Sequence, residues 1–145
     1  MLSSGTTKGE QMSAENVDVV RRFEDAFASG DIDGVLASLT DDVVVHECDS
    51  VPYPGDYGGK DGFMQLLQDF IATWELEGGL VVEEILPAGD DRVLVLAHAD
   101  VVAKATGKAL ELRIAEVYTI RDGAIADIVV HYWDTHAMVE ATTAA

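Results

Sequence analysis

The spacing of hydrophobic residues in the first half of the chain predicts three helices. From Ser13, a favourable N-cap, to Gly30, apolar residues recur every three or four positions, which is the period of one helical face. A short second helix is predicted from Gly34 to Leu39, and a third from Asp61 to Trp74 has a broad apolar face. Between them, a strand is expected at 43–48 and a Pro- and Gly-rich loop at 49–60.

The second half of the chain changes to the period of β-strands. Apolar stretches separated by turn signals predict strands at 80–86, 93–104, 109–120 and 124–133, followed by a short helix at 134–142. Asp122-Gly123 is typical of a tight hairpin, because this pair accepts positive φ angles. Helices followed by an antiparallel meander indicate the α+β class, with a strongly bent sheet whose concave side is covered by three N-terminal helices. Such a cone leaves a cavity typical of small-molecule sites.

The length of 145 residues suits one domain, which we expect to span residues 13–142. Residues 1–12 are small and polar, and are predicted to form a disordered tail. The N-terminus has no apolar signal segment, and no apolar run reaches the roughly 20 residues that a membrane span needs. A single cysteine, Cys48, precludes an intrachain disulfide. These features favour a cytoplasmic protein.

The charge of the chain narrows its possible partners. Lys and Arg number 9 and Asp and Glu number 27, which gives a formal net charge of −18. Nucleic acids and anionic membranes are therefore not expected as partners, because both bind through basic patches. A neutral or cationic partner is favoured. No His-x-x-x-His, Cys-x-x-Cys or phosphate-loop spacing is present, so neither a metal nor a cofactor is predicted.

Four titratable residues lie within the apolar strands of the second half: His98, Asp100, Glu116 and His131. Burying such a group costs several kcal/mol unless it is paired or its pKa shifts, so convergence on a pocket would indicate a functional site. Side chains alternate across a strand, and the four converge only if their three faces line the same cavity. Parity alone leaves this open, because the opposite face of residues 93–104 is also apolar.

The chemistry that these groups favour is general acid–base catalysis. A carboxyl in an apolar pocket has a raised pKa, and histidine titrates near neutral pH. The hydroxyl groups of Tyr53, Tyr57, Tyr118 and Tyr132 could donate hydrogen bonds to a developing oxyanion. Tryptophans could form apolar walls, and one histidine could lie at the rim. The residues expected to line the pocket are His46, Tyr53, Trp74, Tyr118 and Trp133.

Each site residue also has a structural interpretation. His98 could be a core histidine bonded to a backbone carbonyl, and Asp100 could face solvent at a sheet edge. Glu116 could form an ion pair with Arg113 or Arg92. Asp134 is expected to cap the final helix, and His136, just after it, is expected on the surface.

The order of these elements resembles the nuclear transport factor 2-like (NTF2-like) superfamily, particularly its SnoaL-like polyketide cyclase and ketosteroid isomerase-like branch. The matching stretches are VVRRFEDAFASGDIDGVLASLTDDVVVHE, YGGKDGFMQLLQDF and AEVYTIRDGAIADIVVHYWDT. The resemblance covers about residues 14–138. It implies a cone-shaped, cystatin-like α+β barrel with a deep pocket, and a homodimer formed through the outer sheet face.

The resemblance also bears on individual residues. In limonene-epoxide-hydrolase-like members an Asp-Arg-Asp set activates water, and their Arg-x-Asp strand looks like His98-Ala99-Asp100. The second aspartate falls at His131, so the arginine and one aspartate are both replaced by histidine, which argues against that reaction. In SnoaL-like cyclases an aspartate near the last strand serves as acid–base, and His131 is its nearest equivalent.

The sequence therefore predicts a small cofactor-independent enzyme of the isomerase, cyclase or hydrolase type, acting on a hydrophobic small molecule. His131 or Asp100 would be the acid–base, His98 would orient water or substrate, and Glu116 would tune their pKa values. The alternative is a non-catalytic small-ligand-binding or dimerisation domain of the same fold.

Overall fold

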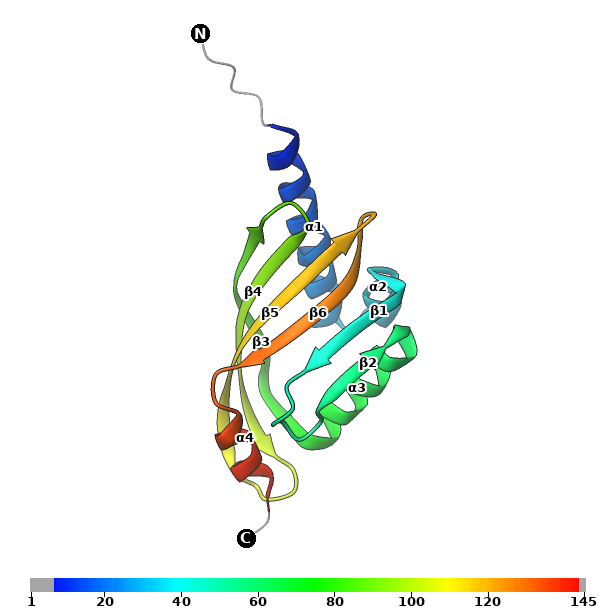
Figure 1. Cartoon of the computed structure of the whole chain (residues 1–145). Coiled ribbons are helices and arrows are strands. Elements are labelled where there is room, and N and C mark those ends of the chain that lie inside the picture. The colour runs from blue at the N-terminus through cyan, green and yellow to red at the C-terminus, as the bar shows by residue number, and fades with distance from the viewer. Residues whose placement is uncertain (1–6, 144–145) are drawn as a thin grey trace.

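The computed structural model describes residues 7–143 as a curved six-stranded sheet with helices packed on its concave side (Figure 1). The helices are α1 (Lys8–Ser29), α2 (Ile32–Ala37), α3 (Gly59–Thr73) and α4 (Thr135–Thr142). The strands are β1 (Leu39–Glu47), β2 (Gly55–Gly58), β3 (Trp74–Ala88), β4 (Arg92–Ala103), β5 (Ala109–Arg121) and β6 (Ala124–Tyr132). The predicted α+β class is confirmed, although the sheet is curved without closing into a barrel.

The strand order is β2-β1-β6-β5-β4-β3. Strands β3 to β6 form the predicted antiparallel meander. Strand β1 instead pairs parallel to β6, which lies far away along the chain, and antiparallel to β2. Strand β2 lies inside the segment predicted to be a loop. Its four residues are too few for a recognisable alternating pattern, and pairing with β1 defines them as a strand.

Helix α1 begins earlier than the sequence pattern predicts. Thr7 caps it by accepting a hydrogen bond from the Glu10 amide at 3.1 Å. Ser13, the expected N-cap, lies inside the helix and hydrogen-bonds to the Gly89 carbonyl, and Asn16 bonds to the Asp90 carbonyl at 2.8 Å. These contacts with the β3–β4 turn hold the polar start of α1 in place. The predicted tail is therefore helical from residue 8, and residues 1–6 lie outside the described part.

Two glycine-containing segments shape the sheet. At Gly78-Gly79, with φ angles of 85° and 80°, the pairing of β3 with β4 shifts register, and β3 continues through the point where the pattern predicted a break. Such a bulge bends a strand. At Asp122-Gly123 the φ angles are 53° and 76°, so the predicted tight hairpin turn is confirmed.

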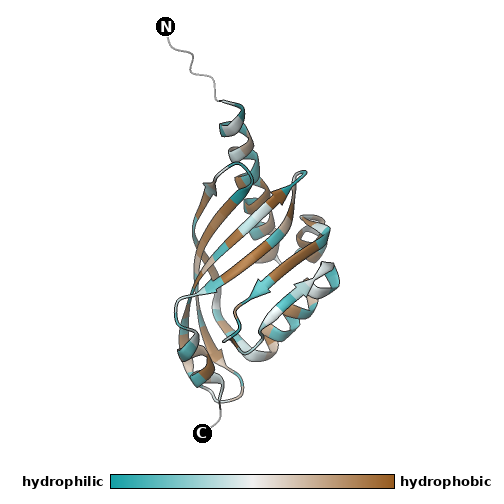
Figure 2. Ribbon diagram, in the orientation of Figure 1, coloured by the Kyte–Doolittle hydropathy of each residue, from teal (hydrophilic) through white to brown (hydrophobic). Residues whose placement is uncertain are grey.

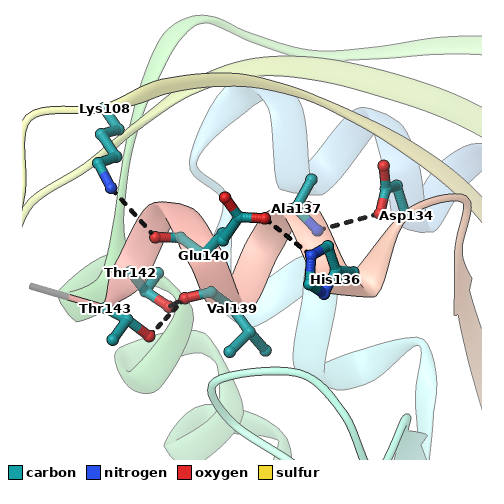
Figure 3. Close-up of polar contacts among 8 residues, drawn as sticks. All are labelled: Lys108, Asp134, His136, Ala137, Val139, Glu140, Thr142 and Thr143. Atoms are coloured by element: carbon teal, nitrogen blue, oxygen red, sulfur yellow. Dashed lines mark hydrogen bonds and ion pairs between the residues drawn. The ribbon is translucent and has the colours of Figure 1, made fainter. Parts of the chain in front are cut away.

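Helix α4 packs across the lower end of the sheet and is held by polar contacts at both ends (Figure 3). Asp134 caps it, as predicted, by accepting from the Ala137 amide at 3.0 Å. The exposed His136 pairs with Glu140 at 2.8 Å, and the Lys108 ammonium donates to the Glu140 carbonyl at 3.4 Å. None of the helices in residues 7–143 is both long and apolar enough to cross a membrane.

The core lies between the concave sheet face and helices α1 and α3. The strands are largely hydrophobic, with hydrophilic residues interrupting them (Figure 2). In β4 every second residue from Val93 to Ala103 is buried, which identifies the odd-numbered residues as the concave face. Phe23 of α1 packs edge-on against Phe63 of α3 and Tyr118 of β5, so one aromatic cluster joins both helices to the sheet.

Candidate active site

A cavity of about 270 Å³ lies between the concave sheet face and the helices. Helix α1 contributes Phe23 and Phe27 to its wall, and helix α3 contributes Phe63 and Phe70. The sheet side comes from β1, β5 and β6, and Leu76 and Leu80, which flank the glycine bulge of β3, complete it. The cavity is therefore mainly apolar, with size and lining suited to a hydrophobic small molecule.

Three carboxyl groups interrupt this apolar wall: Glu24 from α1, Glu47 from the end of β1 and Glu116 from β5. Glu24 and Glu47 are each 8% exposed. Among the described residues that line the cavity there is no lysine, arginine or histidine. Glu24 and Glu47 are thus buried, and Glu116 half-buried, without a cationic neighbour in the wall, an arrangement that favours their protonated forms.

Glu24 and Glu116 meet at one phenol. The Tyr118 hydroxyl lies 2.9 Å from Glu24 Oε1 and 3.1 Å from Glu116 Oε1. A phenol has one hydrogen to donate, so both contacts are hydrogen bonds only when one carboxyl is protonated and donates to the phenol oxygen. Burial, together with the charge of Glu24, raises the pKa of Glu116 to about 8, and burial also raises the pKa of Glu24. The pair therefore retains a proton at neutral pH.

Glu47 lies at the end of a separate hydrogen-bonded chain. Trp74 Nε1 donates to the Tyr53 hydroxyl at 3.0 Å, and that hydroxyl lies 3.2 Å from the Tyr132 hydroxyl. An indole N–H can only donate, so the arrangement that gives every hydroxyl hydrogen an acceptor runs from Trp74 through Tyr53 and Tyr132 to Glu47. Hydrogen bonding to Tyr132 works against burial, which dominates and raises the pKa of Glu47 to about 8.

One oxygen of Glu47 is left available. Its Oε1 atom is buried and has no hydrogen-bond partner in the described structure. Buried polar atoms normally have partners, so an unpartnered carboxyl oxygen on a side chain that lines a cavity is a candidate to bond a ligand once the Glu47 carboxyl turns toward it. Glu47 differs in this respect from Glu24 and Glu116, whose Oε1 atoms are bonded to Tyr118.

Sheet register places Glu47 and Glu116 on either side of one residue. Val130 of β6 pairs with Glu116 of β5 on one side. On its other side β6 pairs with β1, where Val129 is opposite His46, so the next residue of β1, Glu47, lies opposite Val130. Two strand spacings separate their backbones by about 10 Å. A small molecule lying over Val130 could therefore contact both carboxyl groups.

The sequence-predicted catalytic residues divide between the two sheet faces. Glu116 lines the cavity. His98 and Asp100 lie on the even-numbered, outer face of β4, where His98 Nδ1 is 3.3 Å from Glu83 Oε1 and Asp100 is exposed. His131 pairs with Ala115 on that outer face. The condition that all three faces line one cavity is therefore not met, because the opposite faces of β4 and β6 pack against the helices. His98, Asp100 and His131 do not join Glu116 in the cavity, as the predicted catalytic set required.

His131 borders a different hollow. This hollow has a volume of about 280 Å³ on the outer sheet face and also includes Glu83, Arg113 and Trp133. The Arg113 guanidinium lies 4.9 Å from the centre of the Trp133 ring, whose residue is 76% exposed. Trp133 is therefore on the outer surface rather than in the cavity wall.

The remaining predicted pocket residues have three different positions. Tyr118 lines the cavity as expected. Tyr53 and Trp74 are buried behind Tyr132 and support it through hydrogen bonds instead of forming the wall. His46 points to the outer face, where its two ring nitrogens lie 2.8 Å from Asp56 and 2.7 Å from Asp127.

The sequence patterns did not identify Glu24 and Glu47 as site residues, although the sequence contains signals for both, and Tyr132 was expected only as one of four possible hydrogen-bond donors to an oxyanion. Glu24 follows Val20 by four positions and precedes Phe27 by three, so it shares the apolar face of α1. Glu47 continues the inward alternation of Val43 and Val45. An acidic residue that occupies an apolar position in a periodic pattern is the signal that identifies both.

The three cavity carboxyls are not arranged as a metal centre. In residues 7–143, no three His, Cys, Asp or Glu side chains are grouped closely enough to hold a metal ion. What the wall offers instead is carboxyl and phenol groups, which bind ligands by hydrogen bonding and transfer protons.

Comparisons with known proteins agree with this architecture. A 28% identical NTF2-like protein from Burkholderia xenovorans superimposes with a TM-score of 0.78 over 90% of this chain and 97% of its own. One from Burkholderia pseudomallei, 27% identical, gives 0.78 over 90% and 98%. A candidate SnoaL-like polyketide cyclase from Mesorhizobium loti, 25% identical, gives 0.67 over 79% and 97%.

A search among proteins with curated functions gave no significant match. The model of the SnoaL-like domain family, however, matches residues 20–128. This match covers most of the chain and includes α3, strands β1 to β5, the first part of β6 and all three cavity carboxyls. The chain therefore belongs to the SnoaL-like family of the NTF2-like superfamily.

Proposed function

We propose that the protein is a cofactor-independent acid–base enzyme that isomerises, cyclises or hydrolyses a hydrophobic small molecule in the cavity. The observation that carries this proposal is the buried Glu47 oxygen without a partner, on a side chain that lines the same apolar cavity as the hydrogen-bonded Glu24–Tyr118–Glu116 group. The likeness to a candidate polyketide cyclase supports a carbonyl-bearing substrate. Carbonyl substrates undergo enolisation and aldol chemistry, for which an acid and a base are sufficient.

In this proposal Glu47 is the base and Glu116 the acid. The Glu47 carboxylate takes a proton from the carbon next to the substrate carbonyl, and the C–H electron pair forms the enol double bond. The carbonyl oxygen accepts a hydrogen bond or proton from Glu116, whose own partner Tyr118 is linked to Glu24. Returning the proton to another carbon gives isomerisation, and attack of the enol on a second carbonyl gives cyclisation.

The pH dependence follows from the two carboxyls. Proton abstraction needs ionised Glu47, whose fraction rises as pH increases through its pKa of about 8. Proton donation needs protonated Glu116, whose fraction falls through a pKa of about 8. The rate should therefore show a narrow bell shape with its maximum near pH 8.

Paired substitutions test which face carries the chemistry. Turnover would first be sought by mass spectrometry with aromatic polyketide-like ketones, steroid enones and terpene epoxides. Glu47→Gln and Glu116→Gln should each lower kcat about 10²-fold or more while substrate binding persists, since general acid–base groups contribute about that factor. Asp100→Asn and His131→Ala, on the outer face, should leave kcat unchanged. Loss of activity only in the outer-face pair would contradict the proposal.

A non-catalytic pocket protein of the same fold is the second candidate, and the mainly apolar cavity wall favours it. Such a protein would bind the ligand without any turnover that Glu47→Gln could remove. For either function we propose a homodimer formed through the outer sheet face. Its support is a stripe of half-buried apolar side chains, Leu94, Leu96, Val117 and Val129, at the centre of that face.

A further inference from the structure

The charge of the cavity indicates which hydrophobic molecules it selects. Glu24, Glu47 and Glu116 line it, and the described wall contains no cationic side chain. We propose that the cavity binds hydrophobic molecules that carry a basic nitrogen, with the ammonium group held by Glu47 and Glu116. This inference uses the cavity of the proposed function and names its ligand class, but binding of an ammonium ion does not require turnover.

The first argument is geometric. The unpartnered Oε1 atom of Glu47 is an acceptor, and Glu47 itself is 92% buried because its exposed fraction is 8%. An ammonium N–H is a donor, and the amine keeps its charge in the cavity when a carboxylate pairs with it. Because Glu47 and Glu116 flank Val130, a nitrogen placed over Val130 lies between the two carboxyl groups.

The second argument is electrostatic. Burial and the charges of Glu24 and Glu47 raise the pKa of Glu116, so the wall resists carrying several negative charges at once. A bound cation removes this repulsion and stabilises the carboxylates, whereas an anionic ligand adds to it. At pH 7, the free energy needed to ionise a carboxyl with a pKa of about 8 lowers the affinity for the amine only about tenfold. Charge-assisted hydrogen bonds between the ammonium and the carboxylate in an apolar cavity raise the affinity by more than this factor.

The third argument distinguishes an organic cation from a metal ion. No three acidic, His or Cys side chains among residues 7–143 are grouped closely enough for a metal, so the three cavity carboxyls are too far apart to coordinate one ion together. Phe23, Phe63 and Phe70 line the same cavity and provide apolar and aromatic surface for a hydrocarbon body. Phe27 and Ile71, which are 37% and 50% exposed, extend this apolar lining to the surface.

The net charge of −18 adds a long-range contribution. A strongly acidic surface raises the local concentration of cations and lowers that of anions. Free carboxylates, phosphate esters and ligands attached to acidic carriers are therefore disfavoured both during approach and inside the cavity. A hydrophobic ammonium ion is favoured in both places.

The test compares three probes with one hydrocarbon body. Isothermal titration calorimetry at pH 7.5 would measure binding of 4-phenylbutylamine, 4-phenylbutanol and 4-phenylbutyrate, which are cationic, neutral and anionic. We expect the amine to bind at least tenfold more tightly than the alcohol, and the carboxylate to bind most weakly. Titrations in two buffers of different ionisation enthalpy should show proton release with the amine, because protonated cavity carboxyls ionise around it.

Variants locate the effect. Glu47→Gln and Glu116→Gln should each reduce amine affinity at least fivefold while leaving alcohol affinity nearly unchanged. Glu84→Gln, which removes one negative charge from the exposed part of β3, is the matched control and should leave both affinities unchanged. Equal weakening by the control variant would show attraction by net charge alone and overturn the assigned site.

The remaining outcomes separate this inference from the proposed function. Alcohol binding equal to or tighter than amine binding overturns the ammonium proposal and leaves the acid–base function standing, since that function needs only a pocket. Failure of all three probes to bind contradicts the cavity as a ligand site and therefore both proposals. Amine binding that is lost in both cavity variants, with no turnover of any ketone, supports the ammonium inference and contradicts the enzyme.

Discussion

The two faces of the sheet differ in the surroundings that they give to titratable side chains, and two neighbouring residues of β1 illustrate the difference. His46 points outward, where its ring lies between the carboxylates of Asp127 and Asp56. Glu47 points inward, where one oxygen has no hydrogen-bond partner among the described residues. Hydrogen bonds to Asp127 and Asp56 raise the pKa of His46, whereas burial raises the pKa of Glu47. The outer group is stabilised in its charged form and the inner group in its neutral form.

This difference indicates where a ligand acts. Surface charges with opposite partners contribute modestly to stability and need nothing more. A buried carboxyl with an open acceptor position lowers stability when it ionises, and a protein gains from such a group when a ligand uses it. The concave face is therefore the better candidate for chemistry, even though the outer face contains more histidines.

The largest difference between the faces should come from placing an aspartate on each. Val95 points into the core and is fully buried, whereas Val117 lies on the outer face, half-buried. Val95→Asp buries an unpaired charge and should lower the free energy of unfolding by more than about 4 kcal/mol. Val117→Asp should lower it by about 1 kcal/mol or less while converting the proposed dimer to a monomer. Urea unfolding and sedimentation velocity measure the two effects.

The outcome bears directly on the homodimer. A wild-type protein that sediments as a monomer at all concentrations would contradict the proposed interface, as would a Val117→Asp variant that remains dimeric. If Val117→Asp unfolds the chain as severely as Val95→Asp, then the outer face contributes to folding itself, and the distinction between the faces fails.

An effect of intermediate size should come from the pH dependence of Glu47. Its pKa in the folded protein, about 8, lies above the ordinary value, so the folded state retains a proton that the unfolded state releases. Its contribution to stability is complete below pH 4.5 and is lost as pH rises through 8. Glu47→Gln cannot ionise, so its stability relative to the wild type should rise by at least about 2 kcal/mol between pH 5 and pH 9. Denaturation curves at both pH values test this, and parallel curves would show that Glu47 is not held neutral.

The sequence was sufficient for the fold class and most of the elements but insufficient for the faces of the strands. Helical periodicity and the Asp122-Gly123 turn depend on local interactions, and both are present in the structure. The face of β4 depends on packing. Its inner positions include Ala97 and Ala99, while its outer positions include the larger Leu94 and Leu96, so hydrophobicity favours the wrong side. The inner face of β4 is defined by packing against helix α1, a contact between distant parts of the chain that no local pattern contains.

The candidate site was only partly predictable for the same reason. Glu116 and Tyr118 were predicted because they lie in an apolar strand. The strand face chosen for them happened to be the one that lines the cavity. Glu24 and Glu47 belong to elements far away along the chain, and their relevance depends on α1 and β1 meeting β5 around one cavity. The parallel pairing of β1 with β6 aligns Glu47 with Val130 and Glu116. No turn or motif in the sequence predicts this pairing.

The smallest predicted effect concerns His46. Hydrogen bonds to Asp127 and Asp56 raise its pKa, so its contribution to stability is complete below its ordinary pKa of 6.5 and is lost as pH rises through the higher folded value. Wild-type stability should therefore fall slightly above neutral pH, in the same direction as the Glu47 effect, and only variants separate the two. Because Asp56 lies in the edge strand β2, His46→Asn should speed amide exchange in residues 55–58 at pH 6 and leave exchange in β5 unchanged. Equal protection of β2 in wild type and variant would show that the outer-face pairs do not hold that edge, which backbone pairing with β1 would then secure alone.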